Sequence, residues 1–455
     1  MPRIKFPGNV FLSSPEPVAH LTAARMMALA LTGAKITSWG DYCPVTILIK
    51  PHQSALQGGI LAFVFGVTDD GGSPPVATPS RFSECGGCPI PVPSSLYSDN
   101  PHEQFPQRGK RVAVKDVYHM AGTATSASSR DYQSFSGLAK QTSVMVLGLI
   151  EAGAVIVDKT KTAQFASGEH ARDWVDCLCP FNPRGDGYVE PGGSSTGSAV
   201  SVAAFDWLDY GIGTIHVLAS GMPRDLWHSP NSWHPRPWRN ITSIVTKKRD
   251  LGFRDLWNKK MKDALENRPP ITEYLATTLT HIQLFDSFHN NLPFREAFRA
   301  ANGRELYANP MVRFEWDLGS RLTSEEYDTT RQQLEVYRSF AREHIFSDHH
   351  QSTVLVLPAG SPEVRYRDAC DPGFSFQGFG FLRNFYSFLS SLPQVVIPIG
   401  SLSRFSTMTK GVVEEPISVS LVGLEGSDCA LMELAEKVLR KSGRPLEVRT
   451  GACLF

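Results

Sequence analysis

Short strand-like runs alternate with helix-like segments between residues 109 and 214, and this alternation constrains the fold more than any other feature of the 455-residue chain. Apolar runs bounded by turn residues predict buried strands, and a 3.6-residue periodicity predicts the helices between them. The predicted strands are 112–114, 154–157 and 210–214, and the predicted helices are 136–153 and 196–208. Because such alternation is typical of α/β proteins, we expect an α/β domain here.

The charge balance argues against a polyanionic partner. The chain has 45 basic and 45 acidic side chains, with 42% hydrophobic and 20% charged residues, as in ordinary globular proteins. No basic run or face stands out, so neither nucleic acid nor an anionic membrane surface is an expected partner. We expect the partner to be a small molecule, and the sequence does not predict the oligomeric state.

The sequence contains no segment typical of secretion or membrane insertion. The N-terminal residues lack an apolar stretch followed by a cleavage site, and no run reaches the roughly 18 apolar residues of a spanning helix. The eight cysteines are irregularly spaced, unlike a disulfide framework. These features predict a cytoplasmic protein.

Metal binding is not predicted from the cysteines and histidines. Cys85 and Cys88 form a CxxC, but no second pair lies at zinc-ribbon spacing, and a turn at this position is the preferred interpretation. Cys177 and Cys179 form only a CxC further along the chain. His228 and a histidine six residues later lie among prolines and do not have helical ligand spacing.

Composition changes suggest three parts in the chain. Residues 1–70, with an amphipathic helix and two β-like runs, read as a small N-terminal α+β module. Residues 71–107 are rich in Pro, Gly and Ser and predict a linker, followed by the main domain at 108–455. The last third adds predicted strands at 353–357, 394–399 and 417–423 and a predicted helix at 428–441.

Two motifs in the α/β stretch carry the chemistry. Lys115 ends the first predicted strand, and Gly192-Gly193-Ser194-Ser195 precedes the helix at 196–208. Taken alone, a lysine is usually solvated, and a Gly/Ser run is often a linker or a phosphate-binding turn. Here the run leads directly into an apolar helix and lacks the Lys-Ser/Thr ending of a P-loop, which disfavours both alternatives.

The order and spacing of these pieces resemble the amidase signature family. Lys115 matches the catalytic lysine of the family, and Ser194 matches its bridging serine, which follows a cis peptide bond. The closing segments of the chain resemble those of the family, and residues 203–209 resemble fungal members from biosynthetic gene clusters. For residues 108–455 the resemblance implies a central mixed, mostly parallel sheet flanked by helices, with the N-terminal module outside it.

The chemistry of these residue types is consistent with that resemblance. A serine hydroxyl must lose its proton to a base as it attacks a carbonyl carbon. Burial would lower the pKa of Lys115 so that it serves as this base, and Ser194 would relay the proton. The glycines at 192 and 193 would make room for the cis bond. No cofactor and no metal is implied.

The sequence departs from the family pattern where the nucleophile is expected. The family has Gly-Thr-Asp-x-Gly-Gly-Ser, whose backbone N–H groups form the oxyanion hole, whereas here Gly213-Thr214 is followed by Ile-His and then by other residues. Val217 and Leu218 replace the two glycines and would crowd those donors. Ala219 occupies the serine register, and Ser220 is the nearest hydroxyl.

Three explanations for this departure remain open: a working variant that uses Ser220, a catalytically inactive relative, and a splice or frame error after Thr214. The first predicts an amidase that hydrolyses a small-molecule amide or ester through a serine acyl-enzyme in a secondary-metabolite pathway. The second predicts a binding protein that keeps the fold. The glutamine-hydrolysing component of an amidotransferase is a further alternative. Ser198 is a weaker candidate nucleophile, because on the helix it should face packing.

Overall fold

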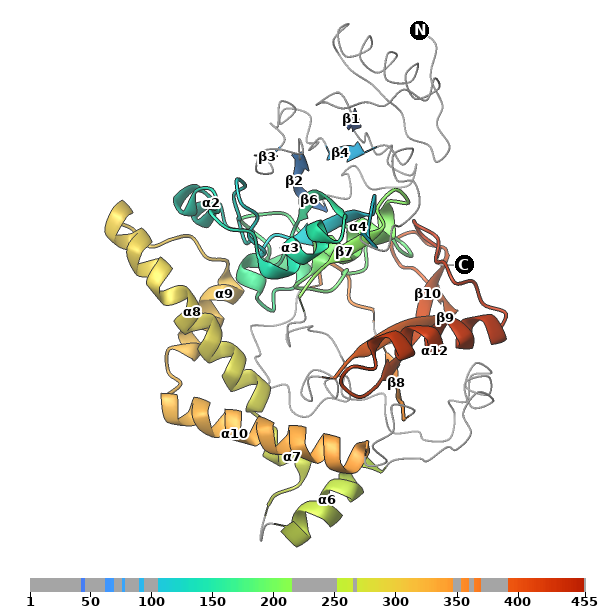
Figure 1. Cartoon of the computed structure of the whole chain (residues 1–455). Coiled ribbons are helices and arrows are strands. Elements are labelled where there is room, and N and C mark those ends of the chain that lie inside the picture. The colour runs from blue at the N-terminus through green and yellow to red at the C-terminus, as the bar shows by residue number, and fades with distance from the viewer. Residues whose placement is uncertain are drawn as a thin grey trace, which may run out of the picture.

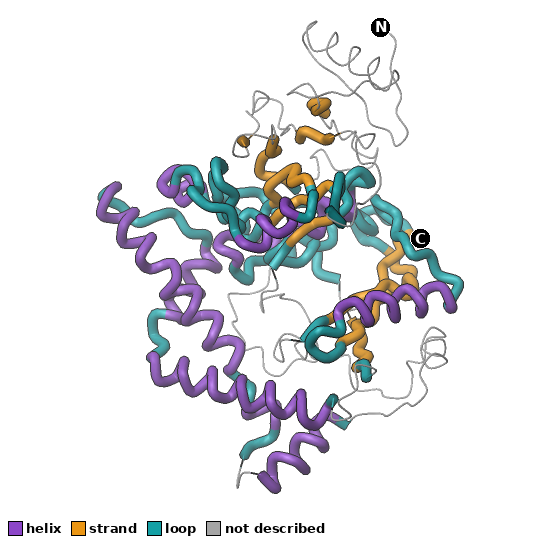
Figure 2. Tube along the Cα trace, in the orientation of Figure 1, coloured by secondary structure: helices purple, strands orange, loops and turns teal. Residues whose placement is uncertain are grey.

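The computed structural model of the chain describes residues 42–45, 62–68, 76–77, 90–93, 105–214, 252–264, 268–346, 353–359, 364–369 and 392–453. Figure 1 shows these residues arranged as a mixed sheet with flanking helices, a group of long helices, and a C-terminal sheet with its own helix. Figure 2 separates the three kinds of backbone and shows that long loops surround the mixed sheet.

The mixed sheet has five strands in the order β3-β2-β6-β5-β7. Its centre is β5 (Arg111–Lys115), which runs parallel to β6 (Val155–Thr160) and to β7 (Tyr210–Ile212). The antiparallel strands β2 (Phe63–Thr68) and β3 (Val76–Ala77) complete one side. The three strands expected from the sequence between residues 109 and 214 are therefore confirmed.

Helices cover the two faces of this sheet, and the alternation of side chains along β5 assigns each residue to a face. Val112 and Val114 pack with Val146 of α3 (Val144–Glu151). Ala113 packs with Phe205, which follows α4 (Thr196–Ala204). Lys115 is two residues beyond Ala113 and therefore lies on the α4 face. The predicted helix at 136–153 is shorter in the structure, where α3 covers only residues 144–151. Ser136 is instead the last residue of α2 (Arg130–Ser136), which ends at Gly137 with φ +66°.

The position of β2 corrects one expectation. The sequence placed residues 1–70 in a separate module, but Phe63 and Gly66 of β2 pair with β6 inside the mixed sheet. Without β2, this edge of β6 would have no neighbouring strand. The pairing with β2 satisfies the backbone N–H and C=O groups along it. Strand β1 (Tyr42–Val45) pairs instead with β4 (Ile90–Pro93) in a two-stranded sheet. The limits at 70 and 107 stay a prediction.

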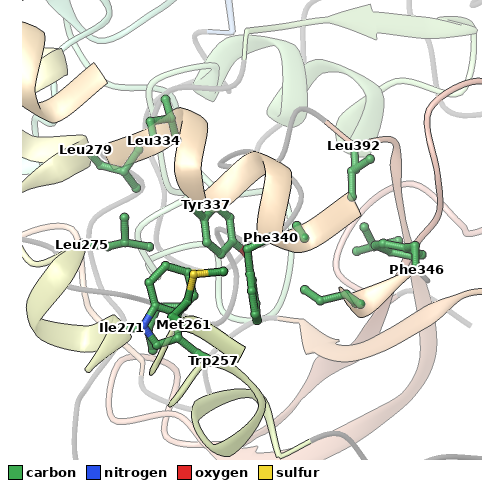
Figure 3. Close-up of a cluster of buried hydrophobic side chains, with 13 residues drawn as sticks. Trp257, Met261, Ile271, Leu275, Leu279, Leu334, Tyr337, Phe340, Phe346 and Leu392 are labelled. Carbon is green, nitrogen blue, oxygen red and sulfur yellow. The ribbon is translucent and has the colours of Figure 1, made fainter. Parts of the chain in front are cut away.

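The long helices form a second group with its own apolar core (Figure 3). Trp257, Tyr337 and Phe340 are buried there, and the ring of Trp257 meets that of Phe340 edge-on at 4.8 Å. A capping box of Thr323 and Glu326 begins the last helix and satisfies its first N–H groups. The helices of this group are α6 (Phe253–Ala264), α7 (Ile271–Tyr274), α8 (Thr278–Asn302), α9 (Pro310–Gly319) and α10 (Ser324–Phe340).

The C-terminal sheet has three antiparallel strands in the order β8-β10-β9. These are β8 (Leu355–Ala359), β9 (Gln394–Phe405) and β10 (Val412–Val422), and α12 (Asp428–Lys441) packs its apolar side on them. The expected strands and last helix are thus confirmed; β9 and β10 are longer than predicted, and β8 is shifted by two residues. Among the described strands, parallel pairing is confined to β6-β5-β7. The direct turn between β9 and β10 explains why these two strands are antiparallel.

Candidate active site

Lys115 forms the centre of the candidate site. It ends β5, its side chain is fully buried, and its Nζ donates to Ser194 Oγ at 2.7 Å and to Thr214 Oγ1 at 2.6 Å. The structure therefore brings together two of the residues singled out by the sequence, which are separated by 79 positions. It adds Thr214, which sequence reasoning noted only as part of a broken motif.

Burial changes the acid–base properties of this lysine. The pKa of Lys115 falls from 10.5 to about 7 because the buried ammonium has lost its hydration. Ser194 and Thr214 offer Nζ hydroxyl groups, which do not supply the opposite charge that would restore a high pKa. Lys115 can therefore lose its proton near neutral pH and then accept one as a base.

The Gly/Ser run presents Ser194 to the lysine. Its peptide bond to Gly193 is cis, and its carbonyl accepts a hydrogen bond from the N–H of Ala163 at 3.1 Å. Gly192 has φ +71°, a conformation that favours glycine. A Cβ on Gly193 would meet nothing closer than 3.4 Å, so the expected need for room concerns the backbone of Gly192 rather than space at Gly193.

Ser195 joins this loop to the end of the sheet. Thr214 N–H donates to Ser195 Oγ at 3.0 Å, and Ser195 Oγ donates to Thr214 O at 2.8 Å. A Cβ on Gly213 would lie 2.7 Å from Ser195 Oγ, so only glycine allows this approach. The two hydrogen bonds hold the Thr214 backbone, and hence its hydroxyl, beside Lys115. The only sequence signal for this role is that both residues belong to the family motif.

A second buried lysine lies on the opposite face of the same strands. Lys159 Nζ forms an ion pair with Asp116 at 2.9 Å and donates to Tyr118 O at 2.6 Å. Asp116 also accepts the N–H of Ser126 at 2.9 Å and the hydroxyl of the same serine. These contacts close the loop that follows Lys115. Sequence reasoning missed the pair, although Asp116 stands directly after Lys115 in the sequence.

The loop after β6 supports Ser194 from another side. Gln164, Phe165 and Ala166 form a short 3₁₀ turn, η4 (Gln164–Ala166), in which Phe165 has φ +52°. Glu169 accepts the N–H of Gln164 at 2.7 Å, and Gln164 accepts the N–H of Asn309 at 2.6 Å. Gln164 and Ala166 are buried and pack inside the protein. The turn is thereby tied to the segment before α9.

Ser198 has a structural role. It is 3% exposed, its hydroxyl donates to Ile212 O at 2.9 Å, and it lies 2.7 Å from Thr160 Oγ1. These contacts link α4 to β6 and β7, as expected for a helix residue that faces packing.

Four predicted site residues lie outside the described part of the chain: Val217, Leu218, Ala219 and Ser220. The same holds for Cys85, Cys88, His228 and His234. Of the remaining cysteines singled out by the sequence, Cys177 and Cys179 are free thiols, and burial raises the pKa of Cys179 to about 12. Within the described ranges, no group of three or more His, Cys, Asp and Glu side chains is arranged to hold a metal ion. No helix in these ranges is long and apolar enough to cross a membrane.

Comparison with known proteins agrees with this arrangement. Residues 101–214, which carry Lys115, Ser194 and Thr214, match the model of the family called Amidase. Amidase 1 of Oryza sativa subsp. japonica is 23% identical over 418 residues, covering 74% of this chain and 92% of the rice protein. Amidase 1 of Arabidopsis thaliana is 36% identical over 27% of each chain. The chloroplastic outer envelope protein 64 of Arabidopsis thaliana is 34% identical over 27% of this chain and 20% of its own.

These matches indicate the class of protein. Over residues 101–214 the chain matches the amidase signature family, a class of hydrolases that act on the carbon–nitrogen bonds of amides. Its backbone also aligns with the native peptide amidase from Stenotrophomonas maltophilia, with 17% identity over 75% of this chain and 84% of that one, at a TM-score of 0.46. The chain spans most of the length of the rice relative but only about a quarter or less of the two Arabidopsis relatives.

Proposed function

We propose that the chain hydrolyses a small-molecule amide through a serine acyl-enzyme, with Lys115 as the base and Ser194 as the proton relay. The contact of 2.7 Å between Lys115 Nζ and Ser194 Oγ carries this proposal, together with the pKa of Lys115 at about 7. A neutral amine that is hydrogen-bonded to a hydroxyl can accept the proton of the nucleophile through that hydroxyl, so no histidine is needed.

The proposed reaction has two steps: formation of an acyl-enzyme and its hydrolysis by water. The nucleophilic hydroxyl, assigned to Ser220 because it is the hydroxyl nearest the family's serine position, attacks the amide carbon while its proton passes through Ser194 to Lys115. Return of that proton to the leaving nitrogen breaks the carbon–nitrogen bond and leaves an acyl-enzyme. Water then attacks the ester in the reverse proton sequence, which releases a carboxylic acid and regenerates the serine.

The setting of this reaction is also part of the proposal. The balanced charge of the chain supports a small neutral substrate rather than a nucleic acid or a membrane surface. An ester would react by the same two steps, because an alkoxide leaves more readily than an amine. We base a cytoplasmic location and a role in a secondary-metabolite pathway on the sequence alone. The boundaries of the main domain, 108–455, also rest on the sequence alone.

A binding protein without catalytic activity is the second candidate. Val217 and Leu218 at the family's glycine positions favour it, because side chains there would crowd the donors of an oxyanion hole. A sequence error after Thr214 would produce the same departure. The binding protein would keep Lys115 and Ser194 but activate no serine, whereas a sequence error predicts that the segment after Thr214 folds poorly.

Reaction with a fluorophosphonate probe, followed by intact mass and peptide mapping, tests the proposal. We expect one adduct on the peptide that contains Ser220, absent from Lys115→Ala and Ser220→Ala and retained by Ser134→Ala, an exposed control on α2. No labelling of a folded protein would favour the binding protein. An adduct on another serine would overturn the Ser220 assignment, and a chain that does not fold would favour the sequence error.

A further inference from the structure

A cleft of about 360 Å³ lies between the η4 turn and the helices α8, α9 and α10. Figure 1 shows these helices together beside the mixed sheet. The volume of the cleft is within the range of small-molecule sites, which begins at roughly 300 Å³. Phe165, Leu279, Ile282 and Leu334 give it apolar walls.

Among the polar side chains that line the cleft, Gln283 and Glu315 bring buried polar atoms to it. Gln283 Oε1 is buried and accepts no hydrogen bond within the part of the chain that the structure describes. A buried acceptor of this kind is destabilising unless a ligand or water supplies a donor. The position of Gln283 therefore favours a ligand with an N–H or O–H group.

Glu315 supplies the complementary group. Its side chain is 1% exposed, and its Oε1 accepts the N–H of Gly168 at 2.9 Å. Burial raises the pKa of Glu315 to about 8, so its carboxyl group carries a proton at pH 7 and can donate to a ligand carbonyl. Gln283 and Glu315 thus place a buried acceptor and a donor in the same cleft, which is the pattern that an amide group complements.

The charged residues at the cleft are already paired. Asp286 accepts the hydroxyl of Tyr327 at 2.8 Å, and Arg338 forms an ion pair with Glu335. A charged ligand would have to compete with these contacts and lose its hydration, whereas an uncharged ligand would not. The cleft therefore favours a neutral molecule.

The cleft adjoins the candidate active site along the chain. Ala163 N–H is bonded to Ser194 O, and Phe165, two residues later, forms part of the cleft wall. We propose that this cleft is the recognition site for an uncharged amide with an apolar substituent, held by Gln283 and Glu315. That this amide is a second group of the substrate, apart from the one hydrolysed, rests on the proposed function; the binding itself does not.

Calorimetric titration of two ligands into the Lys115→Ala protein tests the cleft without turnover. N-acetyl-leucinamide has an apolar side chain and a second amide, whereas 4-methylpentanamide keeps the side chain and lacks that amide. We expect the first to bind about tenfold more tightly, the factor expected of one or two modest hydrogen bonds. Gln283→Leu should remove this difference, while Gln332→Leu, an exposed glutamine on α10, should preserve it.

Each outcome bears on one of the two proposals. Equal binding of the two ligands would contradict the proposed recognition site, even if the Gln283→Leu protein fails to fold. Retention of the tenfold difference in a folded Gln283→Leu protein would also overturn it. A difference that depends on Gln283, together with no fluorophosphonate labelling of the unaltered chain, would support the cleft and contradict the proposed hydrolysis. Labelling without such a difference would support only hydrolysis.

Discussion

Lys115 and Lys159 lie on neighbouring strands of one sheet, and both are fully buried, yet their surroundings differ. Lys159 faces the carboxylate of Asp116 at 2.9 Å, whereas Lys115 contacts the hydroxyls of Ser194 and Thr214. A carboxylate compensates a buried ammonium, but hydroxyl groups do so only weakly. The partner, rather than burial, therefore separates a lysine that stabilises a loop from one that can act as a base.

Replacing the base should give the largest effect. In Lys115→Met the fluorophosphonate labelling rate should fall by about 10³-fold, within the range of general-base contributions. Melting temperature should change little, because methionine fills a similar volume without a charge to desolvate. Lys110→Met, just before the same strand and half-exposed, is the matched control and should label normally. Normal labelling of Lys115→Met would remove this lysine from the mechanism.

Removing the carboxylate of the other lysine should mainly affect stability. Asp116→Asn leaves Lys159 buried without an opposite charge and should lower the free energy of unfolding by about 3 to 5 kcal/mol. Asp209→Asn, which removes the exposed partner of Lys110, should cost less than about 1 kcal/mol. Urea denaturation measures both. Similar small losses in the two variants would show that the buried pair does not support the fold as described.

Glu315 extends the comparison to a buried acid that has no cationic partner among the described residues. Its pKa is about 8 in the folded chain and 4.5 for the ordinary group, so between these values the folded state holds a proton that the unfolded state releases. Stability should therefore be full below pH 4.5 and fall as pH rises toward 8, by about 1.4 kcal/mol per pH unit from this group.

Glu315→Gln should remove that part of the pH dependence. Unfolding free energies at pH 5, 6 and 7 should decline less steeply in the variant than in the unaltered chain. Glu325→Gln, an exposed position on α10, controls for the change of side chain itself. Parallel slopes for Glu315→Gln and the unaltered chain would contradict the assignment of a protonated carboxyl group.

The smallest expected effect concerns the second hydroxyl at Lys115. Thr214→Val removes the acceptor at 2.6 Å while keeping the shape of the side chain. Labelling should slow by about fivefold, the value of a modest hydrogen bond. The midpoint of its pH profile should move to lower pH, since the lost hydroxyl favours the ammonium form. An unchanged rate and midpoint would show that Ser194 alone positions the amine.

The sequence was sufficient to find Lys115 and Ser194 because a family motif fixes their order, and their contact follows once β5 and the α4 loop meet. It was not sufficient to find the pairing of Asp116 with Lys159. That pairing depends on the register that sets Val114 opposite Lys159, and strand register cannot be read from short apolar runs.

The other features that the sequence did not predict, a strand pairing and a cleft between helices, depend on tertiary contacts. The strand Phe63–Thr68 was recognised, but its pairing with β6 spans a Pro- and Gly-rich segment that suggested a boundary. Gln283 and Glu315 lie on different helices, and only the packing of α8 and α9 brings both to one cleft. Helix periodicity identifies an apolar face but not which helix covers it.

Direct titration of Lys115 is the sharpest test of its role as a neutral base. In protein labelled with carbon-13 at the lysine Cε atoms, the NMR signal that disappears in Lys115→Met belongs to this residue. Its shift should change with a midpoint near pH 7, as burial beside hydroxyl groups requires. A midpoint near the ordinary value of 10.5 would show that Lys115 remains an ammonium at neutral pH, and the proposed proton transfer would then be excluded.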